Sequence, residues 1–226
     1  LPDLPLPSAP ACTSLKYLEL SCSDVDLIAA FLRMAVAVEV VVLSPKEEHL
    51  EQIYSSVCPT ASALSLRNVS VTNRIADVAT RCQRIANFTF PQCFVTYSAV
   101  TTFGKFTNIR ALDLTHAIFE TENYLSVLAR TCGDKLTELY LYCCVPILPL
   151  VTVQEILPLF TRLESLSLRF EDNLTSLWNM SSFTRLTKLS LYYSGDKKAE
   201  LVSQLTEHCH TNIRELSLRM FASDLA

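Results

Sequence analysis

The sequence predicts an α/β solenoid shaped like a horseshoe, with parallel strands on the concave face and helices on the convex face. A six-residue pattern, apolar at positions one, four and six, recurs nine times along the chain. Between copies, the apolar spacing changes from the period of two typical of strands to the period of about 3.6 typical of helices. One strand and one helix bury their apolar faces only by stacking on neighbouring units, so we expect about nine stacked repeats.

Nine hexamers of the form L-x-x-L-x-L supply the expected strands. Their first residues lie 23 to 27 residues apart, with a mean spacing of about 25 residues. One such hexamer is a common accident, whereas nine at nearly constant spacing are the signature of a repeat protein. The copies are LKYLEL from Leu15, VEVVVL from Val38, ASALSL from Ala61, IANFTF from Ile85, IRALDL from Ile109, LTELYL from Leu136, LESLSL from Leu163, LTKLSL from Leu186 and IRELSL from Ile213.

Apolar stripes with helical spacing separate several of these hexamers. Residues at i, i+3, i+4 and i+7 are apolar in three segments, Ile28–Ala35, Ile75–Cys82 and Leu125–Cys132. This spacing places the apolar side chains on one face of a helix. Each segment is therefore expected to be a helix that packs its apolar face against the strands.

Polar residues mark where some helices are expected to begin. Ser44 has the position of an N-cap, with Pro45 at the first helical position and Glu47 at the third. The same capping-box spacing of a hydroxyl residue and an acidic residue occurs at 23–26 and 152–155. The repeat unit is thus strand, turn, helix and turn.

The repeat resembles the leucine-rich repeat. Its length and its helices are similar to the ribonuclease-inhibitor-like and cysteine-containing subclasses of that family. The cysteine-containing subclass has a cysteine at the end of each helix, and Cys or Asn three residues after the last strand leucine. Two of the nine cysteines, Cys22 and Cys143, do not fit these places. The other seven do: Cys12, Cys58, Cys82, Cys132 and Cys209 before strands, and Cys93 and Cys144 after strands.

The cysteine-containing subclass is best known from F-box proteins, whose repeats hold the substrate of a cullin-type ubiquitin ligase. The resemblance implies a protein-interaction scaffold, the substrate-recognition repeat region of such a receptor. A cullin adaptor is an expected partner only if an F-box lies upstream, because residues 1–11 are too few for that three-helix module. Two alternatives stay open: a stand-alone regulator or inhibitor that binds an enzyme or GTPase, and a receptor ectodomain.

Residues that alternate with the core leucines are expected to point to the concave face. Tyr142, Arg169, Tyr192 and Arg219 directly follow the hexamer in four successive repeats, so we expect a continuous stripe. Tyr and Arg are enriched at the energetic centres of interfaces, which predicts contact with a protein partner that carries acidic groups. The competing interpretation is that they solvate an open sheet face. The candidate partner-binding residues are Arg67, Glu138, Tyr140, Tyr142, Arg169, Lys188, Tyr192 and Arg219.

Composition argues against several other functions. Half of the 226 residues are hydrophobic and the net charge is −4, which predicts a folded chain and no nucleic-acid partner. The most apolar stretch, Ile28 to Leu43, contains Arg33 and Glu39, so no membrane-spanning helix is expected. Nucleotide-binding, nucleophile-elbow and zinc-protease motifs are missing, and the three glycines are isolated. We therefore expect no enzymatic activity, no cofactor and no metal.

The chain is expected to divide into a proline-rich N-terminal segment, residues 1–11, and the solenoid, residues 12–226. The last hexamer has no helix after it, so we expect the chain to be a fragment of a longer protein. Free and mostly buried cysteines are typical of a reducing compartment, which predicts a cytoplasmic or nuclear location.

Overall fold

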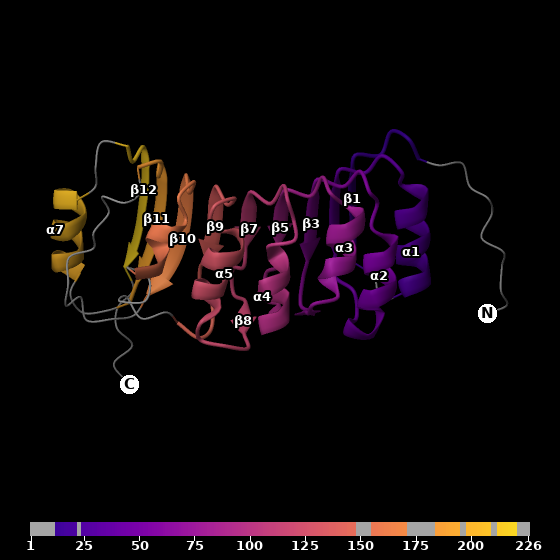
Figure 1. Ribbon diagram of the computed structural model, residues 1–226, viewed down its shortest axis with the longest axis horizontal. Helices are drawn as coiled ribbons and strands as arrows, with labels where there is room; N and C mark the ends of the chain where they lie inside the picture. The colour runs from indigo at the N-terminus through magenta and orange to yellow at the C-terminus, as the bar shows by residue number, and fades with distance from the viewer. Residues whose placement is uncertain are drawn as a thin grey trace.

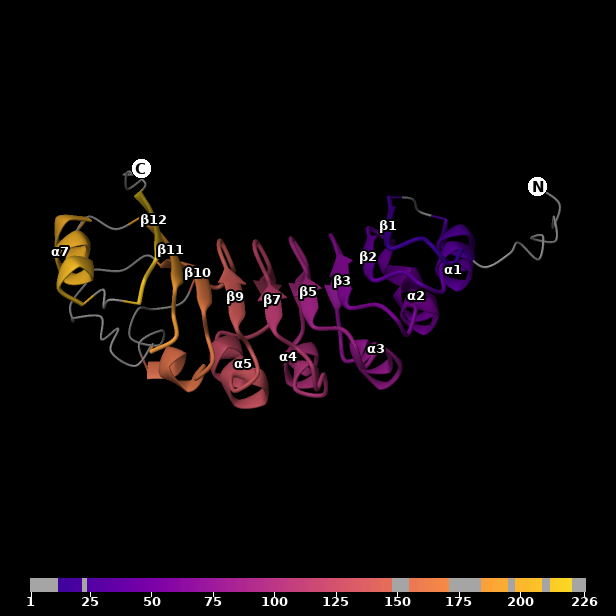
Figure 2. The same ribbon diagram turned by 90° about the horizontal axis from the view of Figure 1, so that it is seen from above.

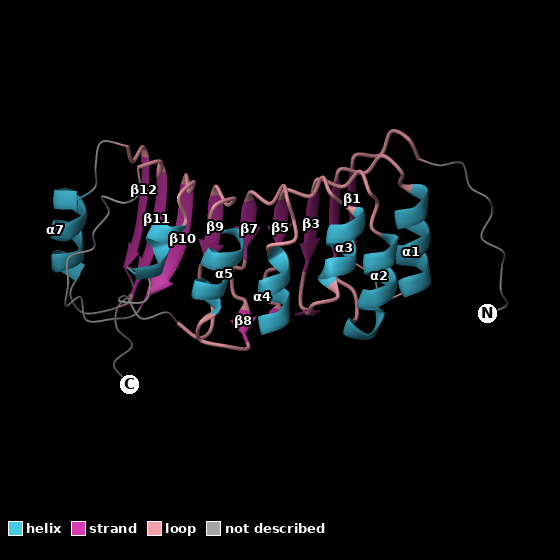
Figure 3. Cartoon of the chain, viewed as in Figure 1, coloured by secondary structure: helices cyan, strands magenta, loops and turns pink. Residues whose placement is uncertain are grey.

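In a computed structural model, the described residues form a parallel sheet of nine strands with helices on one side (Figures 1 and 3). The strands follow one another in chain order, and every pair is parallel. The described residues are 12–21, 24–147, 155–170, 184–194, 198–208 and 212–220. The strands of this main sheet are β1 (Tyr17–Leu20), β2 (Val40–Leu43), β3 (Ala63–Leu66), β5 (Asn87–Thr89), β7 (Ala111–Asp113), β9 (Glu138–Leu141), β10 (Ser165–Phe170), β11 (Lys188–Tyr193) and β12 (Glu215–Met220).

The helices run between these strands and lie on the outer side of the sheet. Figure 2 shows a shallow arch, with the strands lining its inner side and the helices α1 to α5 on its outer side. This arrangement confirms the predicted α/β solenoid. The helices are α1 (Val25–Met34), α2 (Leu50–Ser56), α3 (Ile75–Arg81), α4 (Tyr97–Phe103), α5 (Tyr124–Cys132) and α7 (Lys198–His208), with the 3₁₀ helices η1 (Glu47–His49) and η2 (Leu157–Leu159).

Strand register explains why the hexamer repeats so regularly. Leu166 of β10 pairs with Leu189 of β11, which pairs with Leu216 of β12, so equivalent hexamer positions are neighbours across the sheet. The fourth residue of each hexamer therefore forms a column on the helix side. Because a slip of one residue would turn the whole column toward solvent, the apolar pattern fixes the register.

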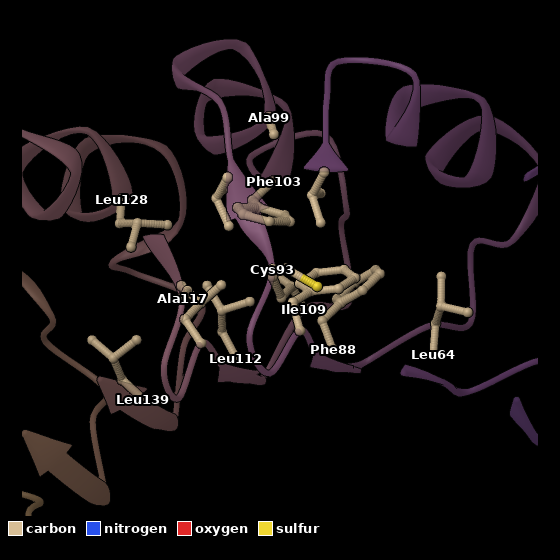
Figure 4. Packing of buried hydrophobic residues seen from close by; sticks show 14 of the residues in the cluster. Leu64, Phe88, Cys93, Ala99, Phe103, Ile109, Leu112, Ala117, Leu128 and Leu139 are labelled. Carbon is tan, nitrogen blue, oxygen red and sulfur yellow. The ribbon is translucent and has the colours of Figure 1, made fainter. Parts of the chain in front are cut away.

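A cluster of four phenylalanines fills the centre of the core. Phe88 of β5 contacts Phe90, Phe103 and Phe106, with ring centroids 5.6, 6.2 and 4.4 Å away. All four rings are buried. Figure 4 shows the strand residue Phe88 and the helix residue Phe103 pointing toward each other between the two layers. We call Phe88, Phe90, Phe103 and Phe106 the phenylalanine cluster.

A left-handed turn follows the strand in four successive repeats. Asn68, Gln92, His116 and Cys143 have φ between 55° and 58°, and each lies two residues after the last apolar residue of its hexamer. The turn directs the residue that follows it inward, and these four residues are buried: Val69, Cys93, Ala117 and Cys144. The chain then enters a second, three-stranded parallel sheet, which the sequence did not predict. The short strands are β4 (Ser70–Val71), β6 (Phe94–Val95) and β8 (Ile118–Phe119).

The predicted N-cap at Ser44 is wrong. Its backbone N–H donates to the carbonyl of Leu20 at 3.3 Å, so Ser44 extends the strand ladder, and the helical segment begins only at Glu47. The cap of α1 is Asp24, whose carboxylate accepts a hydrogen bond from the backbone N–H of Leu27 at 3.0 Å. The predicted caps Ser23 and Thr152 lie outside the described residues.

Five of the seven cysteines at subclass positions are buried, as expected for small apolar groups with a weak donor. The thiol of Cys144 donates to the carbonyl of Leu114 at 3.0 Å, one repeat earlier. Cys12 contradicts the expectation, because it lies ahead of the end strand β1 and is exposed. Cys22 and Cys209 lie outside the described residues. The buried five are Cys58, Cys82, Cys93, Cys132 and Cys144.

The buried thiols are expected to resist alkylation in the folded protein. Burial raises the pKa of Cys82 and Cys93 to about 11 and that of Cys132 to about 12, so the reactive thiolate is scarce near neutral pH. Among the described cysteines, iodoacetamide at pH 8 should modify Cys12 and the half-buried Cys143 first. Peptide mapping by mass spectrometry, with and without urea, measures this. Native Cys93 reacting as fast as Cys12 would contradict the burial described above.

Candidate functional site

Four residues predicted to form a stripe lie side by side at the carboxyl ends of the strands β9 to β12. Strand pairing places Arg169 beside Tyr192, and Tyr192 beside Arg219. The ring centroids of Tyr142 and Tyr192 are 3.9 Å apart, although β10 runs between their strands. The guanidinium carbon of Arg219 is 5.5 Å from the centroid of Tyr192, which is within cation–π range. We call Tyr142, Arg169, Tyr192 and Arg219 the Tyr–Arg stripe.

Two residues that the sequence reasoning missed extend or support the Tyr–Arg stripe. The imidazole of His116 meets the ring of Tyr142 edge-on, with centroids 5.2 Å apart. Nη1 of Arg169 donates to Sγ of Cys143 at 3.4 Å, which orients the guanidinium. His116 and Cys143 both occupy the left-handed turn that follows the strand. Both lie two places after a hexamer, but the residues at this position share no chemical character that would have marked them in the sequence.

The Tyr–Arg stripe combines hydrogen-bond donors with positive charge. The pKa of Tyr142 is raised above its usual value, first by its hydrogen bond with Cys143 and then by desolvation. A tyrosine hydroxyl is protonated near neutral pH even without such a shift, so it can donate a hydrogen bond. Arg169 and Arg219 add two guanidinium groups, which suit carboxylate acceptors in particular.

Three more candidate residues form a polar group toward the amino ends of the same strands. The hydroxyl of Tyr140 donates to Glu138 at 2.8 Å, and Lys188 forms an ion pair with Glu215 at 2.9 Å. Glu215 raises the pKa of Lys188 by hydrogen bonding to the ammonium group. These polar and charged groups therefore largely satisfy one another within the protein.

Arg67 does not join the other candidates. It follows β3, and its guanidinium lies 3.9 Å from the carboxylate of Glu19. The strands β5 and β7 separate it from β9. In these two repeats the equivalent positions are Pro91 and Thr115, which continue neither the aromatic nor the cationic character. The candidate set therefore splits into a single arginine near one end and a cluster near the other.

The described residues show no group of three His, Cys, Asp or Glu side chains that could hold a metal ion. No helix among them is long and apolar enough to span a membrane. The concave face carries small, buried serines between the larger side chains, such as Ser165 and Ser167 of β10.

Comparison with known proteins shows the fold. No family model matches the chain, and no curated protein sequence matches it. An internalin from Listeria monocytogenes superposes with a TM-score of 0.51 at 16% identity, over 94% of this chain and 63% of the internalin. A leucine-rich-repeat protein from Leptospira interrogans gives a TM-score of 0.48 at 13% identity, over 91% of this chain and 61% of its own. The chain thus spans less than two thirds of either protein, and its fold is the leucine-rich-repeat solenoid.

Proposed function

We propose that this solenoid is a protein-binding scaffold whose concave face holds a partner through the Tyr–Arg stripe. One observation carries the proposal: two tyrosine rings and two guanidinium groups from successive repeats form one continuous cluster at the sheet surface. Residues of these types dominate binding energy where they cluster, and the best of them contribute about 2 kcal/mol or more each. The positive charge favours a partner with carboxylate groups at its surface.

The finer proposal is that the chain is the substrate-recognition region of an F-box-type ubiquitin ligase receptor in the cytoplasm or nucleus. Cysteines at the positions of the cysteine-containing subclass, five of them buried, support it. A cullin adaptor is then a partner only of a parent protein that carries an F-box upstream. The alternatives are a regulator or inhibitor of an enzyme or GTPase, and a receptor ectodomain.

Replacing Tyr142 and Arg169 together by alanine is expected to weaken partner binding at least about a hundredfold, because two central side chains are removed. The partner is first identified by affinity purification of the full-length parent and mass spectrometry. Its affinity for the purified solenoid and for the Tyr142→Ala/Arg169→Ala variant is then measured by calorimetry. The thermal midpoint should change little, since neither side chain belongs to the core.

The matched control replaces Tyr97 and Arg130, which lie on the helices α4 and α5 of the outer side and are exposed. Tyr97→Ala/Arg130→Ala removes the same residue types and should leave affinity unchanged. If the stripe variant binds as tightly as the control, the stripe is not the contact surface. Recovery of a cullin adaptor with the parent protein would distinguish the F-box proposal from its alternatives.

A further inference from the structure

A row of arginines follows the opposite edge of the main sheet, at the amino ends of the strands. This is the upper edge in Figure 1, where the turns enter the strands. Because the strands are parallel and in register, the residues that precede or begin each hexamer share this edge. All five arginines are exposed. We call Arg84, Arg110, Arg162, Arg185 and Arg214 the arginine row.

The arginine row has no carboxylate partners in the described part of the chain. None of its members takes part in an ion pair there, whereas Arg74 on the helix side pairs with Glu51 at 2.9 Å. One carboxylate beside the row, that of Glu39, is held by Lys16 at 2.6 Å. This hydrogen bond is the main reason that the pKa of Glu39 is lowered, and Arg84 adds only a smaller contribution. The guanidinium groups of the row are therefore available to an external anion.

Three hollows of similar construction lie along this edge, and each has two members of the row in its wall. Arg84 and Arg110 flank the first, Arg110 and Arg162 the second, and Arg185 and Arg214 the third. Carboxamide and hydroxyl groups also line each hollow, and one carboxylate, Glu39 or Glu164, lines the first and the third. Asn108 and Asn212 are fixed by donating to the carbonyls of Gln83 and Thr184, at 2.7 and 2.8 Å. The edge thus repeats one donor-rich arrangement along the solenoid.

We infer that the arginine row is a second docking surface, which binds an extended acidic segment of a protein partner. The six strands from β5 to β12 span about 24 Å at a spacing of about 4.8 Å, which an extended peptide of about seven residues matches. Guanidinium groups bind carboxylates with two parallel hydrogen bonds, so each hollow can hold one acidic side chain. This surface lies at the other end of the strands from the Tyr–Arg stripe and does not depend on it.

The walls of the hollows favour an acidic peptide over a nucleic acid or a sulfated polysaccharide. The described residues that line the three hollows include no aromatic side chain, so bases would find no stacking surface among them. Glu39 and Glu164 also line them and would repel a polymer with closely spaced negative charges. A peptide whose acidic residues alternate with neutral ones can place its neutral residues beside these carboxylates.

Fluorescence anisotropy with a labelled peptide of alternating glutamate and serine, about twelve residues long, tests this inference. The peptide should bind at low ionic strength, and its affinity should fall at least about tenfold between about 50 and 300 mM salt. Arg110→Glu/Arg162→Glu should weaken binding at least about tenfold. The control Arg33→Glu/Arg130→Glu, with the same charge change on exposed helix residues, should retain most of the affinity.

Four results would overturn the inference. The first is that the peptide does not bind at low ionic strength, and the second is that the control variant weakens peptide binding as much as Arg110→Glu/Arg162→Glu does. The third is that heparin or a single-stranded oligonucleotide binds more tightly than the peptide. The fourth is that Tyr142→Ala/Arg169→Ala loses peptide binding. The last result would place the peptide on the Tyr–Arg stripe. Circular dichroism melting of each variant shows that the fold is retained, so a loss of affinity can be assigned to the surface.

Discussion

Replacing Leu112 by lysine is expected to unfold the chain or to lower its free energy of unfolding by more than about 5 kcal/mol. Leu112 is the central residue of β7 and is fully buried on the helix side of the sheet. A lysine there would place an ammonium group, or a neutral amine without a partner, among apolar side chains. Since a whole domain is stable by only about 5–15 kcal/mol, one such change is enough to unfold it.

The preceding residue supplies the control. Ala111 lies in the same strand but points to the other face and is half-buried. Its neighbour across the sheet is Glu138, which can pair with a new ammonium group. Ala111→Lys is therefore expected to change stability by less than about 1 kcal/mol. Urea denaturation followed by circular dichroism compares the two variants, and equal losses would mean that the two faces are assigned wrongly.

Phe88→Ala is expected to lower the free energy of unfolding by about 3–5 kcal/mol, because it leaves a cavity in the middle of the phenylalanine cluster. Phe88 contacts three other rings, which come from the residue just after β5, from α4 and from the turn after α4. The cavity is difficult to close, since the main chain on both sides is fixed by strand pairing. Loss of edge-to-face contact with Phe106, 4.4 Å away, adds to the effect.

Phe94→Ala is the matched control for this change. Phe94 lies in β6 and is 41% exposed, so its removal should cost less than about 1 kcal/mol. Both variants are measured by urea denaturation at one temperature, with the slope of the transition checked for two-state behaviour. If the Phe88 variant loses no more stability than the Phe94 variant, the phenylalanine cluster is not a centre of the core.

The main sheet could be predicted from sequence because its signal is repeated. Strands such as β10 and β11 have strict alternation and the same hexamer, so one copy supports the assignment of the next. The second sheet could not be predicted, because strands of two residues are too short to show a period. The turn before it also has no glycine: Asn68, Gln92, His116 and Cys143 adopt positive φ, and their residue types do not mark such a turn clearly.

The Tyr–Arg stripe follows from alignment of one hexamer position, which is why the sequence predicted its members. The contact between Tyr142 and Tyr192 across an intervening strand depends on side-chain rotamers, which the pattern does not contain. The arginine row was missed for a different reason. Net charge was summed over the whole chain, where 23 acidic residues outweigh 19 basic ones, and this sum hides a local excess of positive charge.

The chain-order sheet also has a mechanical consequence. Every strand pair in it joins successive repeats, so among the described residues no strand pairing joins the two ends of the solenoid. Under tension applied at the termini, the chain should come apart from an end, one repeat after another. In the folded solenoid, one repeat of about 25 residues adds about 5 Å to the length, which is the distance between neighbouring strands. When that repeat is fully extended, it lengthens the chain by about 80 Å. The protein would then lengthen in discrete steps, and mechanical work would be absorbed as each repeat unfolds.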